Sequence, residues 1–327
     1  MQSPILKPLL TLLTLLTLLT SALAKDPSPL PETQAGWLKS DANPVLGGKL
    51  GTCFDVCLLH SAGKYQMWFS WRPKKSIAIV ESTDGIHWSE PQIVLAPLPQ
   101  SGWEDEINRP VVLKKGDQYH LWFTGQANGH SFIGYATSPD GIHWQRATEK
   151  PVLSSTEPWE KVAVMCPHVE WDEALGLFRM WYSAGEQMEP NAIGYATSPD
   201  GKAWTKLPAN PIFAADPANP WEKHKVTAAQ VIHHRDSYLM FYIGFRDENH
   251  AQIGLARSPD GLTQWQRHPA NPIISPGNGK WDADACYKPF ALFDGLQWRL
   301  WFNGRHGPVE QIGLASHEGE DLGFPKK

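Results

Sequence analysis

Short apolar runs, separated by turns rich in Gly, Pro and Asp, make up most of the chain. The most regular runs are aromatic and occupy residues 67–69, 121–123, 180–182, 240–242 and 300–302. Aromatic and β-branched residues in short runs favour strands, and frequent Gly and Pro shorten every element. The apolar spacing of a long helix is not seen between these runs. The pattern therefore predicts an all-β protein.

One turn signature recurs along the chain. Each copy begins with Ser, a variable residue, an acid and Gly, and four copies continue to a Trp. The copies lie at 82–88, 138–144, 198–204, 258–265 and, in a worn form, 316–319. Their acidic residues are 56 to 60 residues apart. We expect these acids to bond turn amides, a structural role that is typical of Asp beside Gly in a turn. The period itself indicates a repeated supersecondary unit.

Each repeat contains four strand-like segments. An Ile-Gly-Tyr-Ala type run precedes the turn, a short apolar run follows it, and a Trp–acid pair then introduces an apolar and an aromatic run. Five copies of four strands predict a five-bladed β-propeller. The N-terminal segment 37–46 matches 144–153 and 265–274, so we expect it to complete the last blade and close the ring.

The N-terminus has the three parts of a secretory signal peptide. A short basic region precedes the apolar run 9–19, and Ala22 and Ala24 form a cleavage site. The run is shorter than the roughly 20 residues of a membrane span. We therefore predict a signal peptide over 1–24 and one propeller domain over 25–327. The expected location is secreted or periplasmic, with no membrane anchor after cleavage.

Charge and cysteine content exclude several classes of protein. The chain has 29 Lys and Arg against 34 Asp and Glu, a net charge of −5, which argues against general nucleic-acid binding. Four cysteines permit disulfides in an exported protein but do not require them, and no zinc-type Cys pair is present. The sequence leaves open the disulfide state of Cys53, Cys57, Cys166 and Cys286 and the oligomeric state.

Most of the 16 tryptophans occupy repeat positions. They follow the turn signature, lie in the aromatic run or begin the Trp–acid pair, so packing is their expected role. Trp71, Trp171 and Trp298 lie outside these positions. Of these three, Trp71 falls beside the predicted mouth of the central channel, where it is a candidate for stacking on a ligand.

Positions that break the repeat are better candidates for function. Counting back ten residues from the position two residues before each aromatic run (Tyr65, Tyr119, Tyr238 and Trp298) gives Asp55, Arg109, Ala228 and Lys288, and aligning a proline in the third repeat gives Cys166. A purely structural position would hold similar apolar residues in every copy. We therefore expect this position to face the channel.

Other polar residues should gather at the same mouth. Charged groups in a concave site are costly to desolvate unless they bind something, although an ion-paired, water-filled funnel is the alternative. His168 could orient a substrate, act as an acid, help to bind a cation, or be a buried hydrogen-bonded residue. The candidate substrate-binding residues are Trp71, Arg72, Asn108, Arg109, His168, Glu186, Lys225, Arg246, Tyr287, Lys288 and Arg305.

The repeat signatures, together with Asp55 in the first inner strand at 53–56, resemble the five-bladed glycosidases of glycoside hydrolase families 43, 32 and 130. The resemblance covers nearly all of 25–327. It implies that Asp55 is the general base or nucleophile. Two positions depart from the usual pattern, because Arg109 stands where an Asp is usual and Met165 where a Glu acid is usual.

The general acid must therefore come from another carboxyl group. Glu106 is the first candidate, because it lies in a polar loop close to Arg109. The alternatives are Glu170, Glu186 and Asp284. Glycoside hydrolysis needs two carboxyl groups across the scissile bond, one of them protonated. We accordingly predict Asp55, Glu106 and Asp284 as the catalytic group.

The predicted function is cleavage of an oligo- or polysaccharide. Cationic residues at the mouth suit carboxylate or phosphate, which indicates an acidic or substituted sugar or phosphate as the acceptor. A glycoside phosphorylase and a noncatalytic carbohydrate-binding propeller are the alternatives. No cofactor is required, although a structural cation in the channel would be compatible with the sequence.

Overall fold

The computed structural model describes residues 31–325, so the predicted signal peptide at 1–24 lies outside the described residues. The described chain is all-β, as predicted, apart from four short 3-10 turns at Gly48–Leu50, Arg72–Lys74, Pro99–Ser101 and Pro158–Glu160. Within 31–325 there is no helix with the length and hydrophobicity to cross a membrane.

The strands form antiparallel units that follow the sequence repeat. Unit I contains β2 (Cys53–Ser61), β3 (Lys64–Trp71), β4 (Ser76–Ser82) and β5 (Gln92–Leu95). Unit II contains β6 (Glu106–Lys115), β7 (Gln118–Ala127), β8 (His130–Ser138) and β9 (Gln145–Arg146). Unit III contains β10 (Ala163–Asp172), β11 (Leu177–Gly185), β12 (Ala192–Ser198), β13 (Thr205–Lys206) and β14 (Phe213–Ala214).

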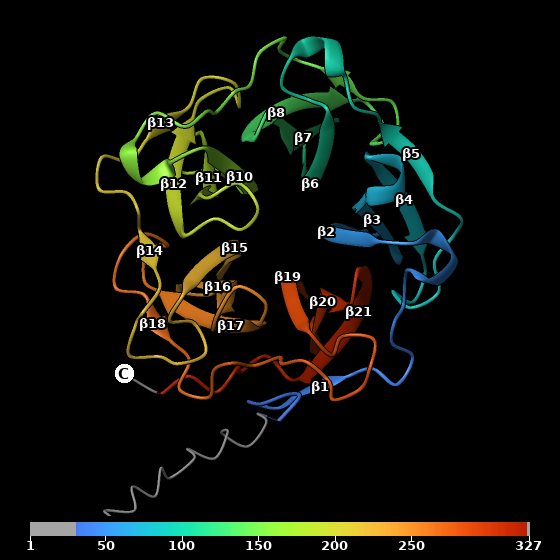
Figure 1. Cartoon of the computed structure of the whole chain (residues 1–327), viewed down its shortest axis with the longest axis vertical. Helices are drawn as coiled ribbons and strands as arrows, with labels where there is room; N and C mark the ends of the chain where they lie inside the picture. The colour runs from blue at the N-terminus through green and yellow to red at the C-terminus, as the bar shows by residue number, and fades with distance from the viewer. Residues whose placement is uncertain (1–30, 326–327) are drawn as a thin grey trace, which may run out of the picture. The chain divides into compact units, whose positions relative to one another are not determined.

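The last two units complete the described chain. Unit IV contains β15 (Lys225–His234), β16 (Ser237–Phe245), β17 (Ala251–Ser258) and β18 (Gln266–Arg267). Unit V contains β19 (Ala285–Phe293), β20 (Gln297–His306), β21 (Val309–Glu318) and the N-terminal strand β1 (Trp37–Lys39). Units II and III share one nine-stranded sheet through a single parallel pairing of Ser131 with Ala163. Figure 1 shows β2, β6, β10, β15 and β19 nearest to a common centre.

Each of these inner strands contains a β-bulge at the position that the repeat alignment singled out. The register shifts between residues 54 and 57 in β2, and at the equivalent place in the other four inner strands. The first bulge residue is left-handed, with φ between 51° and 54°, and is Asp55, Arg109, Cys166, Ala228 or Lys288. Left-handed backbone is unfavourable for side chains larger than Gly. Because such strain persists only where the surroundings impose it, this position marks a candidate site.

The preceding unit fixes four of these bulges. A side-chain oxygen on its second strand accepts a hydrogen bond from the backbone N–H of the bulge residue. The acceptors are Asn303 for Asp55 (3.0 Å), Ser70 for Arg109 (2.8 Å), Thr124 for Cys166 (3.2 Å) and Ser183 for Ala228 (2.7 Å). Ile243 occupies the fifth equivalent position and has no oxygen to accept a bond from Lys288. Neighbouring units are thus joined at the level of the site.

The turn signature has the structural role expected of it. In the second copy, Asp140 accepts hydrogen bonds from the amides of Ile142 and His143, and Ser138 accepts from Gly141. The aromatic strands also contact these turns. Trp68, Trp122, Trp181 and Trp301 each donate an indole N–H to the signature Gly carbonyl of another unit. The abundant tryptophans therefore pack and join the units.

The Trp–acid pairs explain how the outermost strands are held. Glu104, Glu160, Glu222 and Asp282 are fully buried, and each pairs with a cation two residues after a signature Trp. The cations are Arg146, Lys206, Arg267 and Lys39. In unit I, Glu90 replaces the cation, and no Trp–acid pair precedes β2. Unit I therefore lacks both the buried acid and the cation that would pair with it.

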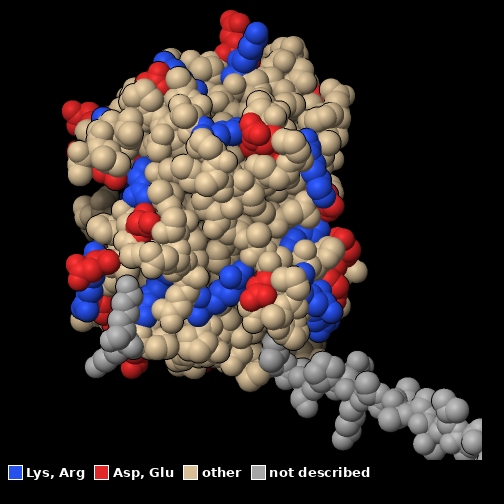
Figure 2. Space-filling model, turned by 90° about the vertical axis from the view of Figure 1, so that its left-hand side faces the viewer, with Lys and Arg blue, Asp and Glu red and all other residues tan. Residues whose placement is uncertain are grey.

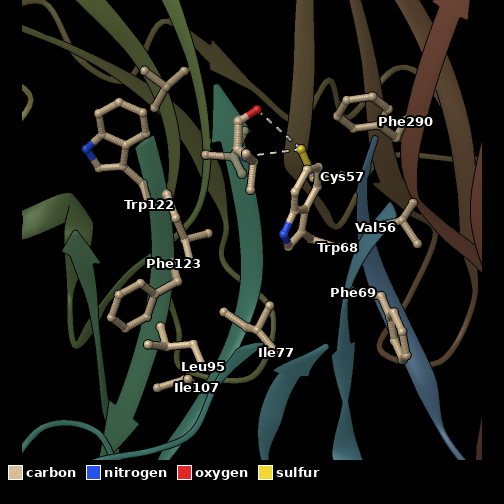
Figure 3. Close-up of a cluster of buried hydrophobic side chains, with 14 of the residues drawn as sticks. Val56, Cys57, Trp68, Phe69, Ile77, Leu95, Ile107, Trp122, Phe123 and Phe290 are labelled. Atoms are coloured by element: carbon tan, nitrogen blue, oxygen red, sulfur yellow. Dashed lines mark hydrogen bonds between the residues drawn. The ribbon is translucent and has the colours of Figure 1, made fainter. Parts of the chain in front are cut away.

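The hydrophobic core lies between adjacent sheets. Figure 3 shows Trp68 and Phe69 of unit I and Trp122 and Phe123 of unit II in one such layer. There the amide of Val112 donates to the sulfur of Cys57 at 3.1 Å. All four cysteines are free and buried. Figure 2 shows basic and acidic side chains interspersed over the face that it draws.

Candidate functional site

A cleft of about 510 Å³ lies where the second strands of the units end, near the start of the inner strands. A narrower cavity of about 30 Å³ shares part of its lining. The residues common to both are Arg72, Arg109, Glu189, Tyr287 and Glu310. The narrow cavity also contacts all five bulge residues, namely Asp55, Arg109, Cys166, Ala228 and Lys288. Five separate segments of the chain therefore supply one site.

Asp55 is buried at the bottom of this site. Its Oδ2 lies 3.6 Å from Nε of Arg109, and Nδ2 of Asn303 donates to its Oδ1 at 3.3 Å. Within the described chain, Oδ2 has no hydrogen-bond partner. The Arg109 guanidinium therefore lies beside a buried carboxyl oxygen that no hydrogen bond within residues 31–325 occupies.

Arg109 is held beside Asp55 by its neighbours. Its Nη1 donates to Oδ1 of Asn108 at 2.7 Å, and Asn108 in turn donates to Gln126. Burial lowers the pKa of Arg109, but attraction to Asp55 and other acidic groups outweighs this and raises the pKa above its ordinary value. Arg109 is thus a permanent cation within the cavity, and Asn108 orients it from outside the lining.

Two glutamates complete the site, and neither was singled out from the sequence. Glu310 is the second residue of β21, and Glu189 lies in the loop between β11 and β12. Counting back two residues from the repeated Ile of the third strands gives Lys75, Ser131, Asn191, Ala251 and Glu310. The rule that found Asp55 would also have found Glu310 if applied to this strand. Glu189 lies in an insertion, where the repeat gives no alignment.

Both glutamates have raised pKa values. Burial raises the pKa of Glu310 to about 7; Arg72 opposes this shift, and the charges of Asp55 and Glu189 reinforce it. Burial likewise raises the pKa of Glu189, while Arg109 lowers it and Asp55 raises it. Arg72 lies 3.4 Å from Oε1 of Glu310. The cavity thus combines an ion-paired Asp55 with carboxyls that favour protonation.

Cationic side chains line the rest of the cleft. Lys225 is almost fully buried and lies 3.2 Å from Glu248 and 3.6 Å from Glu186. Within residues 31–325, Lys288 takes part in no ion pair, and the buried Nε of Arg305 has no hydrogen-bond partner. Burial raises the pKa of Tyr287, so its hydroxyl stays protonated. These three groups on unit V could donate to an anionic ligand.

The structure does not place two of the predicted catalytic residues in this site. Glu106 lies 3.0 Å from Lys75, and Asp284 accepts a bond from the amide of Gly307. Both side chains are substantially exposed, and neither lines the cleft or the cavity. Glu106 begins β6 and Asp284 precedes β19, whereas the residues of these strands that line the cavity lie at the bulges. A short distance along the sequence therefore did not bring these acids to Asp55.

Several predicted binding residues also lie away from the lining. His168 is buried, and its Nε2 lies 2.6 Å from the carbonyl oxygen of Val231. Of the roles considered for His168, this arrangement agrees with that of a buried, hydrogen-bonded residue. The indole N–H of Trp71 is occupied by the carbonyl of Leu50. Arg246 pairs with its neighbour Asp247. Glu170, which was one of the alternatives for the general acid, lies beyond the bulge of β10. By contrast, the lining includes Asp55, Arg72, Arg109, Glu186, Lys225, Tyr287, Lys288 and Arg305.

Metal-ligating side chains do not cluster in the described part of the chain. No group of three or more His, Cys, Asp or Glu residues there is arranged to hold a metal ion. The carboxyls of the cavity are instead interleaved with the guanidinium groups of Arg72 and Arg109.

Comparison with known proteins relates this chain and its fold to glycosidases. The family model of the glycosyl hydrolases family 32 N-terminal domain matches residues 57–211. The structure of a thermostable family-43 glycoside hydrolase superposes with a TM-score of 0.65 at 19% identity, covering 83% of this chain and 91% of that one. These matches confirm the resemblance to the propeller glycosidase superfamily.

Two curated relatives match smaller parts. An uncharacterized protein of Mycobacterium tuberculosis is 29% identical over 145 residues, covering 42% of this chain and 46% of the relative. A beta-1,2-mannobiose phosphorylase of a Thermoanaerobacter strain is 31% identical over 91 residues, covering 23% of this chain and 30% of the relative. The chain thus spans less than half the length of either curated relative.

Proposed function

We propose that this protein is an exported glycoside hydrolase whose five units form the blades of one propeller, with the ring closed by β1. The similarity to family 32 and family 43 proteins supports this proposal. The pairing of β1 with β21 supports the closure, because the N-terminal strand joins the last unit of the chain. The substrate would be an oligo- or polysaccharide that enters the cleft.

The observation that carries this proposal is the gathering of Asp55, Glu189 and Glu310 around one cavity. Hydrolysis of a glycoside needs a charged carboxylate on one side of the bond and a protonated carboxyl on the other. Asp55, ion-paired with Arg109, suits the role of base or nucleophile. The raised pKa values of the two glutamates suit the role of acid.

The test is replacement of Asp55 by Asn. The protein is incubated with a panel of neutral and uronate-containing oligosaccharides, and sugar release and binding are both measured. Asp55→Asn should reduce turnover by at least about 100-fold while leaving the melting temperature and sugar binding nearly unchanged. A variant that cleaves at the wild-type rate would exclude Asp55 from catalysis. Binding without cleavage by the wild type would favour a carbohydrate-binding protein instead.

Phosphorolysis is the second candidate, favoured by the cations of unit V. Within residues 31–325, Lys288 forms no ion pair and Nε of Arg305 has no hydrogen-bond partner, so this side of the site could bind phosphate or the carboxylate of an acidic sugar. The two cases separate in one experiment. If phosphate is the acceptor, cleavage depends on added inorganic phosphate and yields a sugar 1-phosphate. If an acidic sugar is bound, uronate-containing substrates react faster and phosphate has no effect.

A further inference from the structure

We propose that Glu310 is the general acid of the reaction, acting from the last unit of the chain. This inference rests on the proposed glycosidase function. The third unit, where the resemblance places the acid, offers Met165 at that position, and its side chain is fully buried. The site must therefore obtain its proton from a carboxyl that another segment brings to the cavity.

The lining of the narrow cavity restricts the choice. Among the described residues that line it, the carboxyl groups belong to Asp55, Glu189 and Glu310. Asp55 is paired with Arg109 at 3.6 Å, and the proposed function assigns it the role of base or nucleophile. Among the described lining residues, Glu189 and Glu310 remain as the carboxyl groups that could donate the proton, so the question becomes which of the two is held in a fixed position.

Glu310 is anchored from three directions. It lies on β21 opposite Arg305 of β20, and its backbone N–H donates to Oγ1 of Thr52 at 3.3 Å. Nη2 of Arg72 donates to its Oε1 at 3.4 Å, and the Arg72 guanidinium rests 4.3 Å from the centre of the Phe54 ring. A strand and a stacked guanidinium thus fix this carboxyl, as a proton donor requires.

Glu189 is held less firmly. It lies in the loop between β11 and β12, after the exposed Met188. Within residues 31–325 its carboxyl takes part in no hydrogen bond or ion pair, although its backbone carbonyl accepts from Lys225. A loop carboxyl without a partner can approach a bound sugar, but nothing in the chain fixes its distance from Asp55.

The surroundings of Glu310 also suit a cycle of proton donation. With a pKa raised to about 7 by burial, a large fraction of this carboxyl is protonated at neutral pH. Once the proton has left, Arg72 stabilises the carboxylate that remains. The Glu310 carboxyl can therefore donate a proton and be reprotonated, because its surroundings accommodate both the neutral and the charged form.

The chemical step is balanced as follows. The proton of Glu310 passes to the glycosidic oxygen as the bond from that oxygen to C1 breaks, and the leaving sugar departs as an alcohol. Asp55 either accepts a proton from the water that attacks C1 or itself bonds to C1. In the second case, the Glu310 carboxylate then takes a proton from the water that releases the sugar from Asp55.

The experiment compares Glu310→Gln with Glu189→Gln as its matched control. Each variant is tested on two glycosides of a sugar that the wild type cleaves, one with a dinitrophenyl and one with an alkyl leaving group. A dinitrophenolate leaves without a proton, whereas an alkoxide does not. Glu310→Gln should lose about 100- to 10,000-fold in kcat/KM on the alkyl glycoside and less than about 10-fold on the dinitrophenyl glycoside.

The pH profile gives a second readout. An acid must be protonated to act, so wild-type kcat/KM should fall as the pH rises through about 7. This fall should disappear in Glu310→Gln and persist in Glu189→Gln. Melting temperatures verify that both variants are folded.

If Glu189→Gln, and not Glu310→Gln, shows the leaving-group-dependent loss and the loss of the pH-dependent fall, Glu189 is the proton donor and the inference is overturned. Equal losses by Glu310→Gln on both substrates would also overturn it, because they indicate a role other than proton donation. If the wild type cleaves no glycoside at all, the proposed function fails and this inference fails with it. Normal cleavage of both glycosides by Glu310→Gln overturns the inference alone.

Discussion

At the scale of single residues, Asn303 distinguishes the first bulge from the others. Ser or Thr accepts the bulge amide in three other units, and a hydroxyl suffices for that bond. Asn303 accepts from the amide of Asp55 and also donates to its carboxylate. The longer side chain thus performs the repeated structural task and orients the Asp55 carboxylate. We infer that Asn303 is a positioning residue for Asp55.

Replacing Asn303 by Ser tests this role. The variant keeps an acceptor for the bulge amide but loses the contact with Oδ1 of Asp55. We expect kcat to fall by about 10- to 100-fold with little change in KM, because a small displacement of a catalytic group is costly. Steady-state kinetics measure kcat and KM separately for each variant. Thr124→Ser is the matched control, since it changes an equivalent acceptor away from Asp55 and should leave kcat unaltered. An unchanged kcat in Asn303→Ser would contradict the positioning role.

At the scale of strands, the hydrogen bonds from the bulge amides to side-chain oxygens of the preceding unit show how neighbouring units are fixed to each other. Each bond joins the second strand of one unit to the inner strand of another, so it spans an interface that otherwise contains mainly apolar contacts. A buried amide without an acceptor is costly. The left-handed bulge residue adds strain that this bond helps to offset.

Replacing Ser183 by Ala should therefore destabilise the protein. The backbone N–H of Ala228 loses its buried acceptor, which costs about 1–3 kcal/mol. Urea unfolding should show a lower midpoint. Ser183→Thr keeps the hydroxyl, as Thr124 does in the neighbouring unit, and should cost less than Ser183→Ala. Equal midpoints for wild type and Ser183→Ala would show that another group satisfies this amide.

At the scale of the whole molecule, Lys39 links the two ends of the described chain. Its Nζ lies 2.5 Å from Oδ2 of Asp282, and it also donates to the carbonyl of Ser275 at 2.6 Å. Asp282 is completely buried, and Lys39 is its ion-pair partner among the described residues. The N-terminal strand therefore contributes both a β-pairing and a buried counter-charge to unit V.

Replacing Lys39 by Met should destabilise the molecule strongly. Asp282 would be left as a buried charge without its partner, at a cost of about 3–5 kcal/mol. Lys280→Met is the matched control, because Lys280 forms an exposed ion pair with Glu32 and its loss should change stability little. Urea or thermal unfolding compares the two variants. If Lys39→Met is no less stable than Lys280→Met, the buried pair does not hold the N-terminal strand.

The sequence by itself determined the all-β class, the four-strand repeat and the position of Asp55, because each depends on a local period that the chain repeats. It also placed Asp55, Arg109, Cys166, Ala228 and Lys288 at one equivalent position, which the structure shows as the bulge. The resemblance to propeller glycosidases followed from the same repeated residues, and the comparisons confirm it.

Only the tertiary structure decided which acids meet Asp55. Glu106 and Asp284 lie on the approach to inner strands but outside the lining, whereas Glu189 and Glu310 reach the cavity from other strands and loops. The physical reason is that a charged cavity is assembled from side chains that converge in space, and the direction of each depends on strand register and bulges. The repeat spacing relates equivalent strand positions such as that of Glu310, but it offers no alignment for Glu189, which lies in an insertion.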